Sequence, residues 1–340
     1  MARLRGVLPK VGQYALVLWA AATLNFALPH LAPGDPVNYL YGEAQNLAPE
    51  LLAQVRAGYG LDRSLLEQYG AFWAGLMRGD LGSSVEFNRP VLEILLEYLP
   101  WTVALVGVAT LVSVVLGALL GAWTAWQSLS SRGRGGTRRD ATTVVGVLAL
   151  DAMPGFWIGM ILIAVFAVQL GWFPSYGAAT IDSVGLAWLG EVAARMALPA
   201  ATLVLATLGG FFLLSRAAMV TVLDEPFIRL ARAKGLSERQ VALSHALRNA
   251  LLPVYTNLTL AVGTLLSGVV VVETVFAYPG LGGLIFNAVT VRDYPLLQGA
   301  FLLVTVGVIA ANLFADLTYP LLDPRVRRMP SRRAAAEATA

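Results

Sequence analysis

The chain has 340 residues, of which 57% are hydrophobic and 13% charged, with a net charge of +3 and a mean hydropathy of +0.67. Too few charged residues remain to cover a soluble globule, so the composition indicates a membrane protein. Cysteine is absent, which excludes disulfides, thiolate metal sites and a cysteine nucleophile. Neither Lys10 nor Lys234 follows the glycine spacing of a phosphate-binding loop, so we expect no nucleotide site, metal site or cofactor in this chain.

Six apolar segments are each long enough to cross the hydrocarbon as a helix, which takes about 20 residues. Backbone polar groups must be satisfied within each crossing, so the predicted fold is all-α with six transmembrane helices. The expected crossings are 11–30, 101–126, 141–170, 196–215, 252–273 and 295–317. The first segment follows Arg3, Arg5 and Lys10 as a signal peptide would, but its apolar run is too long for one, so we expect it to stay attached.

The positions of Lys and Arg predict the orientation, because translocated loops carry few of them. Placing both termini in the cytosol puts 18 of the 24 Lys and Arg residues on the cytosolic side. The expected parts are the N-terminal end with the first crossing (1–30), an extracytoplasmic insert (31–99), a core (100–320) with a cytosolic loop (221–252), and a cytosolic tail (321–340).

The insert has its own helical pattern, which predicts a folded element. Its apolar side chains recur at helical spacing and a glycine follows them. The stripe is Leu66, Tyr69, Phe72, Trp73 and Leu76, followed by Gly79. Two roles stay open: a cap that only packs on the crossings, or a surface that also receives another protein.

The cytosolic loop predicts a rigid pair of short helices. Asp224 is expected to cap the first, Pro226 fits its opening turn, and Gly235 suits a left-handed stop. Ser237 and Gln240 form a capping box that opens the second helix. Its predicted apolar face is Leu243, Ala246, Leu247, Ala250 and Leu251. A loop that only supplied positive charge would not need two capped helices, so we expect a mechanical role.

Residues 231–254, ARAKGLSERQVALSHALRNALLPV, resemble the coupling loop, or EAA loop, of ABC importer permease subunits of the oligopeptide and dipeptide type. In the general pattern Glu-Ala-Ala precedes a glycine and Ile-x-Leu-Pro follows. Positions 229–231 and 245–248 correspond to those two motifs, and only Ala231, Gly235 and Leu247 agree with the general pattern. This divergent form resembles one of the two peptide permease subunits.

The resemblance covers nearly the whole chain, because further motifs follow in the same order. They are LAPGDP at 31–36, YGLD at 59–62, QYGAFW at 68–73, GDLGSSVEFNRPV at 79–91, PGFWIG at 154–159, VVVETVFAYPGLGGL at 270–284, RDYPLLQG at 292–299 and NLFADLTYPLLDPRVR at 312–327. Any single motif is weak evidence, but their order along the predicted topology is specific.

The resemblance implies a non-catalytic permease subunit of an ATP-driven importer in the bacterial cytoplasmic membrane. It also implies four kinds of partner: a homologous second permease, two cytosolic ATPase subunits, an extracytoplasmic binding protein and a peptide substrate. The insert would then dock the binding protein. The residues expected at the ATPase contact are Phe227, Arg229, Ala231, Arg232, Lys234, Gly235, Leu236 and Leu247.

Ionisable residues within the crossings are costly unless they line a cavity or find partners. If the third crossing starts near 141, Asp151 is expected near the membrane midplane, with Pro154 loosening the helix, where it either attracts the amino group of a substrate or pairs with another helix. If the crossing starts near 152, Asp151 lies at the interface. Asp151, Pro154 and Glu273 are the candidate residues of the substrate pathway. Glu273 and Asp316 are expected at opposite interfaces, and Asp316 is expected to pair with Arg216.

Several alternatives to these interpretations are considered on the sequence alone. Gly209 and Gly210 predict close helix packing first and a hinge second. A secondary carrier would use Asp151 or Glu273 as a proton site, but no inverted repeat is visible, and an intramembrane enzyme would need a nucleophile–base pair that the crossings do not offer. The cargo of the importer could be dipeptides, longer peptides, glutathione or nickel.

Overall fold

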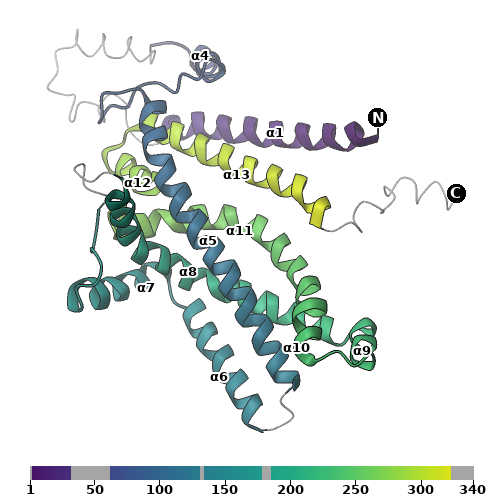
Figure 1. Ribbon diagram of the computed structural model, residues 1–340. Coiled ribbons are helices and arrows are strands. Elements are labelled where there is room, and N and C mark those ends of the chain that lie inside the picture. Colours follow the sequence, from purple (N-terminus) through teal and green to yellow (C-terminus); the bar gives the residue numbers. More distant parts are fainter. Residues whose placement is uncertain (1, 32–61, 131–133, 178–184, 323–340) are drawn as a thin grey trace. The chain divides into compact units, whose positions relative to one another are not determined.

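The computed structural model describes residues 2–31, 62–130, 134–177 and 185–322, and their secondary structure is helical apart from one isolated bridge between Ser83 and Pro90 (Figure 1). Its long elements are α1 (Ala2–Leu31), α5 (Val91–Ser130), α6 (Arg134–Asp151), α8 (Leu186–Leu223), α11 (Leu247–Val275) and α13 (Tyr294–Leu322). The short ones are α4 (Leu65–Met77), α7 (Gly155–Leu162), the π-helical η2 (Ile163–Gln169), α9 (Pro226–Ala233), α10 (Glu238–Gln240), the π-helical η3 (Val241–Ala246) and α12 (Leu281–Val291).

The chain divides into two compact units. Unit 1 comprises residues 1–104 and 277–309, and unit 2 comprises residues 105–276 and 310–340. Because α5 runs through residue 104 and α13 through residue 309, both helices contribute to each unit.

Unit 1 holds the folded part of the predicted insert. Ser64 and Glu67 form a capping box at the start of α4, and the two hydrogen bonds that Ser64 donates to the Glu67 carboxylate lower the pKa of that carboxyl group. Phe26 of α1 packs against Tyr69 and Phe72, with ring centroids 5.2 and 5.5 Å apart. The predicted stripe is therefore half-buried except at Leu66, which is exposed.

A buried carboxylate fastens the insert to the last two helices of unit 1. Asp293 lies between α12 and α13, and it accepts hydrogen bonds from the Ser84 hydroxyl and from the backbone N–H groups of Val85, Glu86 and Leu296. Four donors satisfy most of the lone pairs of the carboxylate, which offsets the cost of its burial. Around it, α5, α12 and α13 share one apolar core.

Helices α5 and α8 cross closely within unit 2. Gly117 and Gly121 of α5 have the spacing of a small-residue packing motif. A Cβ added at Gly121 would lie 2.3 Å from the Phe212 carbonyl oxygen and 2.9 Å from the Arg216 backbone nitrogen. At the same crossing, the Ser215 hydroxyl donates to the Ala118 carbonyl over 2.8 Å. The two backbones touch directly, and only glycine leaves room for this.

The third crossing is not the single helix expected over 141–170. Helix α6 ends at Asp151, and α7 with η2 continues from Gly155 to Gln169 at an angle of 98° to the segment 140–151 (Figure 1). Pro154 occupies the N-cap of α7 with φ −58° and ψ 134°, an extended conformation that cannot continue a helix. The break follows from local backbone chemistry that the hydropathy pattern does not report.

Three described helices are long and apolar enough to cross a membrane, and the bent pair is a fourth if it counts as one span. The three are segments of α5, α8 and α13. Helices α1 and α11 coincide with the predicted first and fifth crossings, but part of each lies outside the described side chains, so the count of six stays a prediction. Residues 32–61 of the insert and 323–340 of the tail also lie outside the described residues.

Candidate functional site

The candidate site is the helical hairpin that follows α8, residues 221–252. Helix α8 ends at Leu223 with Asp224 as its C-cap, and Glu225 occupies the N-cap of α9 without a side-chain capping bond. The prediction that Asp224 caps α9 is therefore wrong by one residue. Pro226 takes the first position of α9 as predicted, because its missing N–H and fixed φ suit that position.

The turn between α9 and α10 depends on one glycine. Gly235 has φ +81°, and its backbone N–H donates to the Arg232 carbonyl over 2.9 Å. Arg232 also pairs with Glu238 across the turn at 2.9 Å. Ser237 and Gln240 then form the predicted capping box at the start of α10. Three local devices therefore set the angle between the two arms of the hairpin.

The inner face of the hairpin packs on the ends of α5 and α8. Its buried side chains include Ile228 and Ala231 of α9, Val241 and Ala242 of η3, and Ala250. The π-helical geometry of η3 adds a residue to the turn and shifts the register. The face predicted from α-helical spacing is therefore wrong at Leu243 and Leu251, which are exposed, whereas Ala246 and Ala250 are buried.

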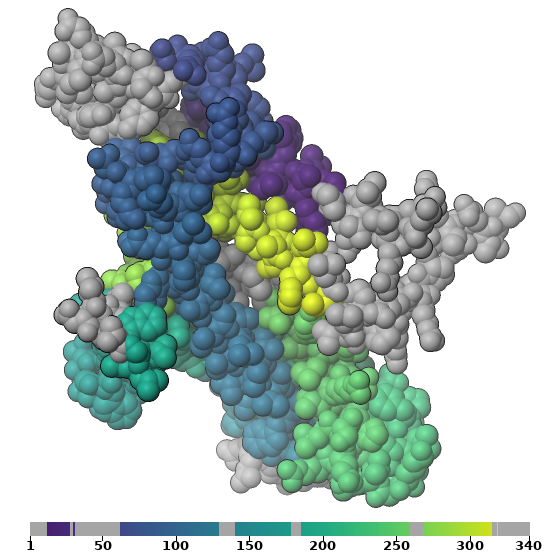
Figure 2. All heavy atoms as spheres, turned by 45° about the horizontal axis from the view of Figure 1, so that its top comes forward, coloured from purple at the N-terminus to yellow at the C-terminus, as the bar shows by residue number. Residues whose placement is uncertain are grey.

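The outer face of α9 carries exposed apolar and basic side chains. Phe227 is 42% exposed and Leu230, one helical turn further, is 57% exposed. In Figure 2 the green surface of the hairpin faces the viewer, and no other described segment lies in front of it. Exposed apolar side chains beside cations are typical of a docking surface. Leu230 was missed by the sequence reasoning, although its spacing from Phe227 was a signal.

The predicted coupling residues separate into two groups. Ala231 is buried and Leu236 and Leu247 pack against the core cluster, so these three hold the hairpin on unit 2. The side chains that face outward are Phe227, Arg229, Arg232 and Lys234. Gly235 sits at the turn.

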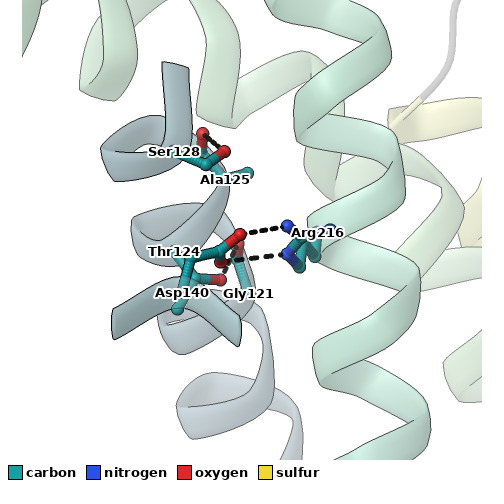
Figure 3. A network of polar contacts seen from close by, with 6 residues as sticks. All are labelled: Gly121, Thr124, Ala125, Ser128, Asp140 and Arg216. Atoms are coloured by element: carbon teal, nitrogen blue, oxygen red, sulfur yellow. Dashed lines mark hydrogen bonds and ion pairs between the residues drawn. The ribbon is translucent and has the colours of Figure 1, made fainter. Parts of the chain in front are cut away.

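The end of α8 next to the hairpin is tied to α6 by an ion pair. Arg216 Nη2 lies 2.6 Å from Asp140 Oδ2, and the side chains are 28% and 11% exposed (Figure 3). The predicted partner of Arg216 was Asp316, whose side chain lies outside the described residues. Sequence reasoning overlooked Asp140 because it stands just before the apolar segment and has no spacing relation to Arg216.

We expect Asp140→Ala to destabilise unit 2 by about 2 kcal/mol, a value between those of exposed and fully buried pairs. The loss arises because Arg216 would remain partly buried without its carboxylate. Thermal unfolding of the purified protein in detergent measures it. The double variant with Arg216→Ala should cost much less than the sum of the single changes; strictly additive losses would show that the pair contributes nothing.

The three predicted pathway residues lie in unit 2. Asp151 ends α6 and is exposed, and a Cβ added at Gly209 of α8 would lie 2.3 Å from its Oδ1. This contact confirms close packing at Gly209, whereas a Cβ at Gly210 would meet nothing within 4 Å. Pro154 forms the break described above. Glu273 is fully buried, and its position at a membrane interface stays a prediction.

Comparison with known families decides what kind of protein carries this hairpin. Residues 113–328 match the family model described as the binding-protein-dependent transport system inner membrane component, and residues 3–106 match its N-terminal model. The chain belongs to this family. The permease therefore is a membrane transport component, and the ends of α8 and α11 with the hairpin between them lie inside the matched range.

The chain matches two curated relatives over nearly the whole length of both sequences. The dipeptide transport system permease protein DppB of Escherichia coli K12 is 36% identical, with 95% of this chain and 99% of the relative covered. The di/tripeptide transport system permease protein DppB of Pseudomonas aeruginosa UCBPP-PA14 is also 36% identical, with 94% and 97% covered. A crystal structure of an amino acid ABC transporter with histidines is 14% identical with a TM-score of 0.44, covering 69% of the permease and 94% of that chain.

Proposed function

We propose that the permease is one of two membrane subunits of an ATP-driven importer of dipeptides and oligopeptides in the bacterial inner membrane, with both termini in the cytosol. Its partners are a homologous second permease, two cytosolic ATPase subunits and an external binding protein. The curated relatives, which are named for dipeptide and di/tripeptide transport, support the peptide cargo over glutathione or nickel.

The observation that carries the coupling role is the two-sided construction of the hairpin. Its inner face is locked into the core of unit 2, while Phe227 and Leu230 remain exposed with cations beside them. An element that is rigid on one side and open on the other can pass a displacement from a docked protein to α8 and α11. In this proposal ATPase closure moves the hairpin, and the hairpin moves those two helices.

Replacing Phe227 and Leu230 by serine should detach the ATPase subunits without unfolding the permease. Both side chains are exposed, so the fold loses little, while the docking surface loses its apolar anchors. Copurification of the ATPase subunits on a tagged permease measures this, and we expect a loss of at least about tenfold, because anchor residues contribute about 2 kcal/mol or more each.

The control is Leu66→Ser, which replaces an even more exposed apolar side chain on α4 in the other unit. It should leave the ATPase subunits bound. Full retention of the ATPase subunits by the Phe227→Ser, Leu230→Ser variant would remove the hairpin from the docking surface.

Concentrative uptake in proteoliposomes tests the whole assignment. The complete assembly with a loaded binding protein should accumulate a radiolabelled dipeptide when ATP is present on the ATPase side, and should not do so with a proton gradient alone. The permease by itself should accumulate nothing. Accumulation by the lone permease on a proton gradient would instead establish the secondary-carrier alternative.

A further inference from the structure

The contacts that α6 and α7 make along α8 show how far Asp151 lies from Arg216 along that helix. Asp140 pairs with Arg216 at one level of α8, and Asp151 packs on Gly209, seven residues away, or about 10 Å at the rise of an α-helix. Gly155 follows beside Ala206 and Gly159 beside Thr202. The contacts of α6 and α7 therefore advance steadily along α8, away from Arg216.

These contacts place Asp151 beside the apolar part of α8. The predicted fourth crossing, 196–215, ends next to Arg216, so Gly209 is about 9 Å inside that end. An aspartate has a single methylene group and cannot extend its carboxylate over such a distance to the headgroups, as Lys or Arg would. The carboxylate is therefore at a depth where charge is costly unless water or a cation meets it.

Although Asp151 packs against α8, its side chain remains exposed at this depth. Asp151 is exposed, and among the described residues no hydrogen bond or ion pair reaches its carboxylate. Two other acids of unit 2 differ from Asp151: Asp140 is paired with Arg216, and Glu273 is fully buried. Gly209 is the feature of α8 that makes room for the carboxylate, because a Cβ at that position would overlap it.

We propose that the Asp151 carboxylate faces the water-lined translocation path and binds the amino-terminal ammonium group of the passing peptide. This inference rests on the proposed function and adds a specificity-determining residue to it. An ammonium group is a compact cation with three donors, and a carboxylate in a partly dehydrated path binds it through short, charge-assisted hydrogen bonds. The break at Pro154 places this carboxylate at a helix end instead of within a continuous helix.

Transport by the complete assembly tests the role of the charge. Asp151→Asn keeps the shape of the side chain and removes its charge, so uptake of a free-amino dipeptide should fall about 10- to 100-fold, as expected for the loss of one charged hydrogen bond. ATP hydrolysis stimulated by the loaded binding protein, and copurification of all subunits, should not change. Asp151→Glu, which keeps the negative charge, should restore part of the uptake.

Thiol labelling tests whether Asp151 meets water. The chain has no cysteine, so Asp151→Cys introduces the only thiol of the permease. In the assembled importer this thiol should react with a charged, water-soluble methanethiosulfonate, and an excess of the dipeptide during turnover should slow the reaction. Asp62→Cys, labelled in the absence of the binding protein, gives the reference for an accessible position, and the unsubstituted permease gives the background.

Several results would overturn the inference. Unchanged uptake by Asp151→Asn would show that the charge does not act on the cargo. Loss of subunits or a lowered Tm in that variant would show that a cation of the second permease holds Asp151, and a parallel fall of uptake and ATP hydrolysis would show a conformational role. An unreactive Cys at 151, with a reactive Cys at 62, would place the side chain away from water. If the unsubstituted assembly imports no dipeptide, the proposed function itself fails, and the labelling experiment still reports whether position 151 meets water.

Discussion

Gly235→Val is expected to lower ATP-driven peptide uptake at least about fivefold while ATP hydrolysis continues. Gly235 has φ +81° in the turn between α9 and α10. A residue with a Cβ in the left-handed region costs about 1–2 kcal/mol, and a β-branched one more, which shifts the equilibrium against the native turn by about 5- to 30-fold. The two arms of the hairpin would then lose their fixed angle, so ATPase closure would no longer move α8 and α11. Uptake per ATP hydrolysed, in proteoliposomes, measures the effect.

Gly235→Asn is the matched control for this prediction. A Cβ at Gly235 would meet nothing within 4 Å, so the expected defect comes from backbone conformation and not from a clash. Asparagine tolerates the left-handed region better than any β-branched residue, and it should therefore retain most of the uptake. If the valine variant transports with normal stoichiometry, the angle of the hairpin is not what couples the two reactions.

Gly121→Ala is expected to destabilise the permease by about 3 kcal/mol, at the upper end of the cost of overpacking. Its new methyl group would lie 2.3 Å from the Phe212 carbonyl oxygen and 2.9 Å from the Arg216 backbone nitrogen. Both are backbone atoms of α8, so no side chain can turn aside, and the two helices must separate. The separation would also lengthen the Ser215–Ala118 hydrogen bond. Thermal unfolding in detergent should show a clearly lower Tm.

Gly107→Ala on the same helix should change the stability in the opposite direction. A Cβ at Gly107 would meet nothing within 4 Å, so the substitution only removes the conformational freedom of a glycine inside a helix. The loss of this freedom should raise the free energy of unfolding by about 0.5–1 kcal/mol. Equal effects of the two substitutions would contradict the direct backbone contact of α5 and α8.

The sequence predicted the hairpin well because its signals are local. Pro226, Gly235 and the pair Ser237–Gln240 each act on their own turn of the backbone, and each takes the conformation that its chemistry favours. The same reasoning failed at Asp224, because helix α8 continues to Leu223, eight residues past the predicted end of the crossing at 215, and Asp224 becomes its C-cap. It also failed at Leu243, which lies in the π-helical η3. The apolar pattern was interpreted with α-helical spacing, and nothing in the sequence indicated a π-helical turn.

The residues that act across the fold could not be predicted in the same way. The partner of Arg216 is Asp140, which is 76 residues away, and the choice depends on how α6 packs against α8. The room for Asp151 likewise depends on Gly209 of a different helix. Several carboxylates and cations have compatible chemistry, and proximity alone selects among them.

By itself the sequence determined that this is a helical membrane protein, that it resembles the peptide permeases, and that a capped hairpin with a glycine turn follows α8. Composition, hydropathy and turn chemistry are properties of short segments, so they need no partner in space. Only the tertiary structure decided that Glu273 is buried, and that Asp151 is packed against Gly209 while its side chain stays exposed. Those outcomes arise where helices distant in sequence compete for the same volume, and packing decides that competition.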